Sequence, residues 1–238
     1  MKIFIDAGHN YSGVGTGAVG NGLKEQEITF YISDKLKSLL IAAGYEVKMS
    51  RNKMKDNLGK TLSEGLNLRA KMANEWGADL FVSIHCNAFN GKARGTEVLV
   101  YSLKSKSVDT AKKIKDAIVK NLDTIDRGVK ERPDLCVLRK TSMPALLVET
   151  AFIDNVADAQ ALAYRNSDFA EAIFEGITGK KVKSDDLTEI EDIISELSKR
   201  EIITDKALWS KKLKEDENAY WLAQKTVKYI LSKKLDEM

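Results

Sequence analysis

Two short apolar segments of this 238-residue chain each lead into a small polar cluster that contains a histidine. Residues 3–5 precede His9, residues 80–84 precede His85, and the sequence holds no other histidine. Such apolar runs are typical of strands that are covered on both faces, as in a parallel sheet between helices. Because open α/β sheets carry their chemistry at the carboxyl ends of the strands, the two histidines predict one shared metal site at that edge.

Strand patterns alternate with helix patterns along most of the chain. Apolar runs predict strands over residues 2–7, 46–50, 79–85, 96–101 and 145–149. Apolar residues at helical spacing predict helices over residues 25–44, 62–76, 105–122 and 155–176. This alternation predicts an α/β fold with a mainly parallel sheet flanked by helices.

The pattern changes after residue 179. A short Lys-rich stretch at 180–184 predicts a linker, and residues 185–238 show only helical periodicity. We therefore expect one domain over residues 1–179 and a small all-α domain over 185–238. Four aromatic residues of this tail could stack on sugar rings and bind a cell wall: Trp209, Tyr220, Trp221 and Tyr229. The alternatives are a homo-oligomer formed through the C-terminal helices, or a tail that only stabilises the chain.

The charge balance excludes some partners. The sequence has 38 Lys and Arg against 35 Asp and Glu, a net charge of +3, which does not indicate a nucleic-acid or membrane-surface partner. The sequence contains no run of about 18 apolar residues, so it does not predict a membrane span. The first strand begins at the second residue and leaves no room for a signal peptide, so we expect synthesis in the cytoplasm.

A zinc hydrolase needs a third protein ligand, and the sequence offers Glu25, Glu27 and Cys86. Glu25 lies three and seven residues before Ile28 and Ile32, and therefore on the sheet-facing side of its helix. Glu27 is turned about 200° from that side. Cys86 follows His85 directly and should face the opposite side of the sheet. Helical geometry therefore favours Glu25.

Glu149 ends an apolar strand at the same kind of position as the histidines. A carboxyl group there is partly desolvated, which raises its pKa towards the range of a general base. We assign Glu149 to acid/base catalysis, and the alternative is an ordinary salt-bridge partner.

The loop between residues 13 and 22 contains a G-x-G-x-x-G pattern at residues 15–20, which could indicate a dinucleotide site. The pattern neither follows its strand at once nor opens a helix directly, and this disfavours such a site.

Several blocks of the sequence resemble, in order, those of the zinc-dependent N-acetylmuramoyl-L-alanine amidases of the type 3 family, which include autolysins and phage endolysins. The blocks are Asp6-Ala-Gly-His9, Gly22-Leu-Lys-Glu25, Ser50-Arg51, residues 68–74, residues 78–87, Gly95-Thr-Glu97-Val98 and residues 147–155. The resemblance covers residues 1 to about 178. Ala7 and Gln26 stand where the family often has Pro and Lys, and neither position bears a ligand.

The resemblance implies a twisted, mostly parallel six-stranded sheet, with Zn²⁺ held by His9, Glu25 and His85 and Glu149 as the catalytic glutamate. The implied reaction is hydrolysis of the amide between N-acetylmuramic acid and L-alanine in peptidoglycan. Because we expect no signal peptide, the sequence predicts a phage or prophage endolysin, which reaches the wall once the membrane is permeabilised. The alternatives are a zinc peptidase that cuts the stem peptide and a non-catalytic wall-binding protein.

Four further polar residues in the matched blocks are candidates for orienting substrate: Arg69, Asn74, Asn87 and Asn155. The alternative for each is a solvated or loop-supporting role.

Overall fold

The computed structural model describes residues 1–182, 190–199, 202–216, 219 and 223. It divides into two compact units, Met1–Val182 and Lys183–Met238. The predicted linker at 180–184 spans this division. In the described residues no helix combines the length and the apolar character that crossing a bilayer requires.

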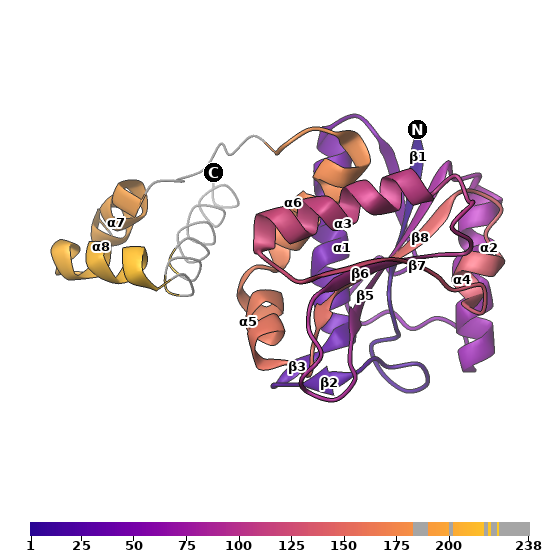
Figure 1. The fold of residues 1–238 in the computed structure, drawn as a ribbon, viewed down its shortest axis with the longest axis horizontal. Helices are drawn as coiled ribbons and strands as arrows, with labels where there is room; N and C mark the ends of the chain where they lie inside the picture. Colours follow the sequence, from indigo (N-terminus) through magenta and orange to yellow (C-terminus); the bar gives the residue numbers. More distant parts are fainter. Residues whose placement is uncertain (183–189, 200–201, 217–218, 220–222, 224–238) are drawn as a thin grey trace. The chain divides into compact units, whose positions relative to one another are not determined.

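The first unit is built around a six-stranded sheet with the strand order β4-β1-β5-β8-β6-β7 (Figure 1). Its strands are β1 (Lys2–Ala7), β4 (Glu46–Met49), β5 (Leu80–Asn87), β6 (Thr96–Val100), β7 (Asp126–Glu131) and β8 (Ala145–Phe152). All neighbouring pairs are parallel except β6 and β8, which are antiparallel. The predicted mostly parallel six-stranded sheet is therefore confirmed.

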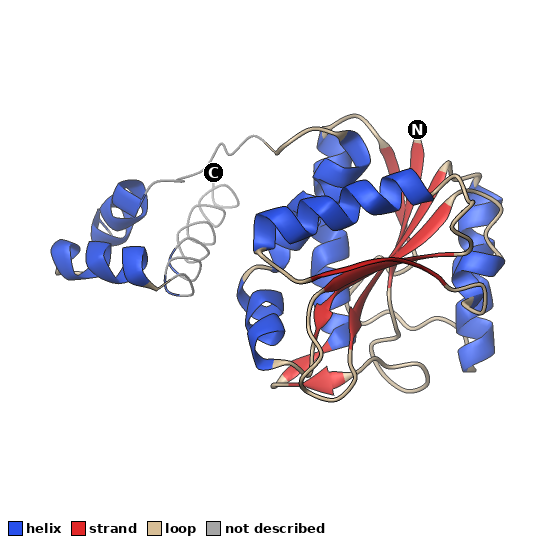
Figure 2. Cartoon of the chain, viewed as in Figure 1, coloured by secondary structure: helices blue, strands red, loops and turns tan. Residues whose placement is uncertain are grey.

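Helices cover both faces of the sheet (Figure 2). One face packs against α1 (Glu25–Ala42), α3 (Val108–Leu122) and α6 (Asn166–Thr178), and their apolar side chains join those of β1, β5 and β8 in the larger core. The other face packs against α2 (Leu62–Trp76) and the short α4 (Cys136–Arg139). A short hairpin, β2 (Val19–Gly20) with β3 (Leu23–Lys24), and helix α5 (Val156–Tyr164) complete the unit.

Most predicted elements lie within a few residues of their expected bounds, and the differences have physical reasons. The predicted helix over 155–176 is two helices, α5 and α6, which meet at Arg165. Strand β7 was not predicted, because its residues Asp-Arg-Gly-Val-Lys-Glu lack alternating apolar side chains. Charged residues are common on an edge strand, where they discourage pairing with another chain.

The described part of the tail is helical, with α7 (Ile190–Lys199) and α8 (Lys206–Glu215). Its buried side chains form a separate small cluster: Ile194, Leu197, Ile203, Leu213 and Ala223. Trp209 packs partly buried against this cluster, with Lys212 Nζ 5.2 Å from its ring centre. The other three aromatic residues proposed for wall binding, Tyr220, Trp221 and Tyr229, lie outside the described residues.

Candidate metal centre

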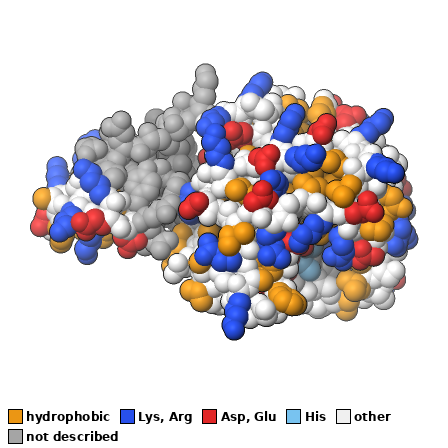
Figure 3. Space-filling view, in the orientation of Figure 1, with side chains coloured by type: hydrophobic (Ala, Val, Ile, Leu, Met, Phe, Trp, Pro, Cys, Tyr) orange, Lys and Arg blue, Asp and Glu red, His pale blue; other side chains and the backbone are white. Residues whose placement is uncertain are grey.

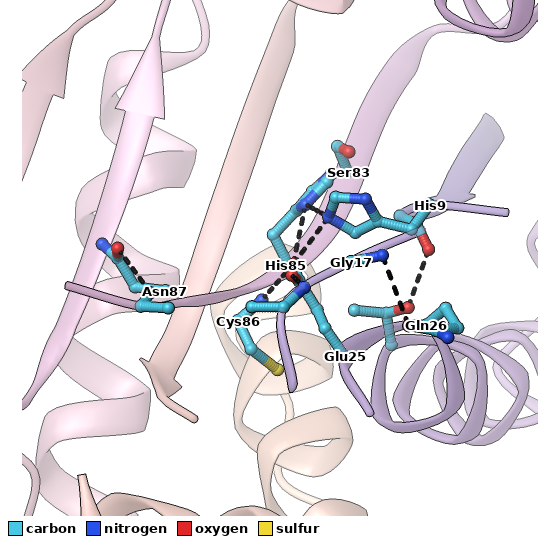
Figure 4. A network of polar contacts seen from close by, with 12 residues as sticks. His9, Gly17, Glu25, Gln26, Ser83, His85, Cys86 and Asn87 are labelled. Carbon is cyan, nitrogen blue, oxygen red and sulfur yellow. Dashed lines mark hydrogen bonds and ion pairs between the residues drawn. The ribbon is translucent and has the colours of Figure 1, made fainter. Parts of the chain in front are cut away.

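His9, Glu25 and His85 come together at the carboxyl edge of the sheet (Figure 4). Glu25 Oε1 lies 2.9 Å from His9 Nε2 and 3.1 Å from His85 Nδ1, and the two ring nitrogens are 3.1 Å apart. Glu25 is the first residue of α1 and is buried, as its helical position predicts. Neither alternative ligand takes part, since Glu27 pairs with Lys24 and the Cys86 thiol bonds to Thr150 Oγ1.

The three atoms fit a divalent ion of the size of zinc. Ligand atoms about 2.0–2.1 Å from a tetrahedral zinc lie about 3.3 Å from one another, close to the spacing observed here. His9 Nδ1 lies 3.2 Å from the carbonyl oxygen of Gly15, which can only accept, so this nitrogen carries the proton and Nε2 presents a lone pair to the site. The cluster is thus a site that could hold a metal ion, made of two imidazoles and one carboxylate.

Burial and charge set the ionisation that metal ligands need. Burial lowers the pKa of His85 below its ordinary value, which keeps the imidazole neutral. Burial opposes the ionisation of Glu25, but its contacts with the two histidines outweigh burial and lower the pKa of this carboxyl. Backbone N–H groups of Ala18 and Cys86 donate to the same carboxylate, at 2.9 and 3.0 Å. Cys86 therefore supports the site through its backbone, while its thiol faces the other side of the sheet.

The backbone of the loop around the site lies in close contact with the three clustered side chains. His9 has a φ of +66°, the left-handed region that few residues other than glycine adopt. A Cβ at Gly17 would lie 2.7 Å from Glu25 Oε2 and 2.9 Å from His9 Cδ2, and a Cβ at Gly8 would lie 2.6 Å from the His85 ring. Glycines at 8 and 17 therefore let the backbone close over the three ligands. This close approach explains both glycines without a phosphate-binding role.

Glu149 lies beside His85 on the neighbouring strand. The two residues are register partners in the β5–β8 pair, and side chains of paired residues share one face of a sheet. Glu149 Oε2 is buried and has no hydrogen-bond partner among the described residues. Burial, with the negative charges of Glu25 and Glu97, raises the pKa of Glu149 to about 8 despite the opposing charge of Arg132. A carboxyl group with this pKa can take and return a proton near neutral pH.

Glu97 is a neighbouring carboxylate whose role the sequence reading missed. It is the register partner of Glu149 in the β6–β8 pair, and its side chain binds Arg127 Nε at 2.8 Å and Lys130 Nζ at 2.6 Å. Burial opposes its ionisation, but these two cations lower the pKa of Glu97. Its only signal in the sequence was its place in a matched block, because its partners come from β7, the strand that the periodicity did not reveal.

The unpaired carboxyl of Glu149 predicts an unusual stability effect in the metal-free protein. The folded-state pKa of about 8 exceeds the ordinary value of 4.5, so the unfolded chain ionises first and stability falls as pH rises from about 4.5 to 8. Glu149→Gln should remove this penalty, and we expect it to raise the free energy of unfolding at pH 8 by about 1–3 kcal/mol. Urea unfolding of both chelated proteins at pH 5 and pH 8 tests this. An equal difference at the two pH values would contradict it.

All four candidate substrate residues make contacts within the first unit. Asn74 binds Lys140 O and Ser142 N at 2.8 and 2.9 Å, next to the start of β8 and hence at the edge of the sheet opposite the metal ligands. Asn155 caps the N-terminus of α5 through bonds from two backbone N–H groups. These contacts give Asn74 and Asn155 structural roles, and their contact with substrate stays a prediction. Asn87 lies at the site edge and donates to Glu97 Oε1 at 3.2 Å.

Arg69 holds the backbone that carries His9, and its contact with substrate stays a prediction. It is 4% exposed, forms an ion pair with Asp6, and donates to the carbonyl oxygens of Ala7 at 2.7 Å and His9 at 2.6 Å. A second buried arginine, Arg51, donates to Gly8 O at 3.1 Å and Gln26 O at 2.7 Å. The two guanidinium groups hold the backbone next to His9 and Glu25.

Replacing Arg69 should therefore destabilise the fold. Arg69→Met leaves Asp6 as an unpaired buried charge, and we expect a loss of about 3–5 kcal/mol in the free energy of unfolding. Lys71→Met is the matched control, since Lys71 pairs with Glu75 on the exposed side of the same helix at 3.6 Å and should contribute less than about 1 kcal/mol. A stable Arg69→Met protein with a raised KM would instead restore the substrate-contact role.

Known proteins share this fold and sequence pattern. Residues 3–179 match the N-acetylmuramoyl-L-alanine amidase family. The chain is 39% identical over 177 residues to the N-acetylmuramoyl-L-alanine amidase CwlM of Bacillus licheniformis, covering 74% of this chain and 65% of that protein. It is 41% identical over 184 residues to the endolysin of Bacillus phage SPP1, covering 74% and 64%. The chain thus spans less than two thirds of the length of these curated relatives.

A solved structure gives the same result for the fold. The CwlD amidase of Clostridioides difficile, determined in complex with the GerS lipoprotein, superimposes with a TM-score of 0.69 at 29% sequence identity. The match covers 75% of this chain and 96% of that one.

Proposed function

The chain belongs to the N-acetylmuramoyl-L-alanine amidase family, and on that basis we propose that it is a zinc hydrolase of peptidoglycan. The bond cleaved is the amide between the lactyl group of N-acetylmuramic acid and L-alanine of the stem peptide. The observation that carries the proposal is the convergence of His9, Glu25 and His85, with the unpaired carboxyl of Glu149 on the adjacent strand.

Zinc is the proposed ion because the donor set is two histidines and one glutamate, a combination that catalytic zinc sites use. When bound, zinc polarises the scissile carbonyl and lowers the pKa of the attacking water. The chain's own residues supply the remaining steps. Glu149 takes one proton from the water and delivers it to the leaving amine, so that one amide and one water give a carboxylic acid and an amine.

The experiment is digestion of purified peptidoglycan by the zinc-loaded full chain, followed by mass spectrometry of the soluble products. Intact stem peptides with a free L-alanine amine, and glycan with free lactyl carboxyl groups, support the amidase. Peptides shortened within the stem would instead indicate the zinc peptidase. Binding to the wall without any new product would indicate a non-catalytic wall-binding protein.

The cellular role that we propose is that of a phage or prophage endolysin, supported by the similarity to the endolysin of phage SPP1. In this role the enzyme accumulates in the cytoplasm and acts on the wall after the membrane is permeabilised. Peptidoglycan is then its partner, bound by the first unit and, through Trp209 and its neighbours, by the tail. Release of the protein into the medium before lysis would contradict the role, and a pull-down of the tail on purified walls tests the binding.

A further inference from the structure

We propose that Arg127 and Lys130 form a subsite for a carboxylate of the stem peptide, on the side of the metal centre where the leaving amine departs. The inference rests on the proposed function. It adds the direction in which the substrate crosses the site and the charge that the enzyme recognises.

A row of titratable side chains crosses the sheet, beginning at the metal ligand His85. His85 on β5 is paired with Glu149 on β8, and Glu149 is paired with Glu97 on β6. Paired residues point to the same face, so the three side chains lie side by side at the strand spacing of about 4.8 Å. Arg127 and Lys130 of β7 extend the row through their bonds to Glu97 Oε2.

The far end of this row carries surplus positive charge. Arg127 and Lys130 share the single carboxylate of Glu97, so one positive charge is not neutralised within the cluster. Their side chains are 32% and 44% exposed, whereas Glu97 is buried. Arg132, which follows β7, adds no surplus charge, because it pairs with Asp134 at 2.8 Å. Figure 3 shows a histidine at the floor of a hollow on this face, with basic and acidic side chains around its rim.

The proposed chemistry fixes which part of the substrate lies over this end. The scissile carbonyl has to lie at the metal ligands, and the leaving nitrogen has to lie within reach of Glu149. The vector from the carbonyl carbon to the nitrogen therefore points from β5 to β8, and the peptide that continues from this nitrogen passes over β6 and β7. Stem peptides carry carboxylates, whereas the acyl side of the bond is an uncharged sugar.

The other side of the centre has the opposite character. A cavity of about 260 Å³ opens beside His9 and His85, between α2 and the segment that leads into α4. Its walls include four aliphatic side chains, Leu62, Leu66, Leu135 and Val137. The charged residues that also line it, Asp6, Arg69 and Asp134, are each paired with an opposite charge. Aliphatic walls suit the methyl groups of a lactyl or N-acetyl substituent better than a carboxylate. The two sides of the site therefore match the two halves of the substrate.

The distances suit a carboxylate close to the scissile bond. Strand β7 lies two strand spacings beyond β8, about 10 Å away. An extended peptide spans about 3.3–3.6 Å per residue, so a carboxylate two or three residues from the leaving amine reaches the cations of β7.

The test compares two muramyl peptides that differ at one group, the α-carboxyl of the second stem residue, which is either free or amidated. We expect Lys130→Gln to lower the ratio of kcat/KM for the acid to that for the amide about tenfold, because one charge-assisted contact is lost. Lys130→Arg should restore the ratio. The control is Lys112→Gln, which removes an exposed charge from α3 on the opposite face and should leave the ratio unchanged.

A further substitution separates the subsite from a purely structural role of the cations in neutralising Glu97. Glu97→Gln frees both cations, so the subsite predicts a higher ratio of kcat/KM for the acid to that for the amide. This holds even where the loss of the Glu97 charge lowers kcat through its effect on the neighbouring Glu149. An unchanged ratio in both Lys130→Gln and Glu97→Gln would overturn the subsite. If the wild-type chain cleaves both peptides but the ratio does not shift in the variants, only this inference is refuted. If the wild-type chain cleaves neither peptide, the proposed function is refuted as well.

Discussion

Glu149→Gln is expected to lower kcat for peptidoglycan hydrolysis by about 10²–10⁴-fold while zinc stays bound. The substitution keeps the size of the side chain but removes the group that accepts the proton of water and returns it to the amine. Glu149 is not one of the three clustered ligands, so zinc content should match that of the wild type. The measurements are turnover of a soluble muramyl peptide and zinc per chain by elemental analysis.

The matched control for this substitution is Glu75→Gln. Glu75 is an exposed carboxylate on α2 that pairs with Lys71 across a helical turn, and its loss should leave kcat unchanged. If Glu149→Gln kept more than about a tenth of the wild-type kcat, another group would have to be the base. If it lost zinc, Glu149 would belong to the ligand set.

His85→Ala is expected to abolish both zinc binding and hydrolysis. The substitution removes one of three ligand atoms that lie about 3 Å apart, and loss of even an outer partner of a metal ligand costs about 10–100-fold in affinity. Saturating zinc should stabilise the wild-type chain by about 4 kcal/mol at 1,000 times its Kd, and this rise in Tm should be absent in the variant. Chelation of the wild type should stop hydrolysis, and added Zn²⁺ should restore it.

Cys86→Ala provides the control for that experiment. Cys86 is adjacent to His85 in sequence and was a candidate ligand, but its thiol lies against Thr150 on the other face of the sheet, where burial raises its pKa. Zinc affinity should therefore survive Cys86→Ala. Equal loss of zinc in the two variants would show that the ligand assignment is wrong.

Local periodicity predicted the parts of the site that depend on a single element. The apolar runs before His9 and His85 marked the strand ends, and the spacing of Glu25 to Ile28 and Ile32 placed its carboxylate on the buried side of α1. Both follow from the geometry of one strand or one helix, which fixes where each side chain points.

The polar residues that depend on distant partners were not predictable in this way. The sequence predicted that Arg69 is either solvated or in contact with substrate. Nothing in its own helix indicates that it pairs with the buried Asp6 of β1. Asn155 read as a substrate contact, although its local sequence suits a helix cap as well. Strand β7 was missed because charged edge strands carry no alternation of apolar residues.

The sequence by itself determined most of the strands and helices and the identity of the residues that end them, because apolar periodicity indicates which side of each element is buried. The exceptions were β7 and the division of residues 155–176 into α5 and α6. Only the tertiary structure decided the order β5-β8-β6-β7, which sets Glu149 between His85 and Glu97 and brings Arg127 and Lys130 to the same row. Strand order and register depend on contacts between segments far apart in the chain, and these contacts leave no periodic trace within any one of them.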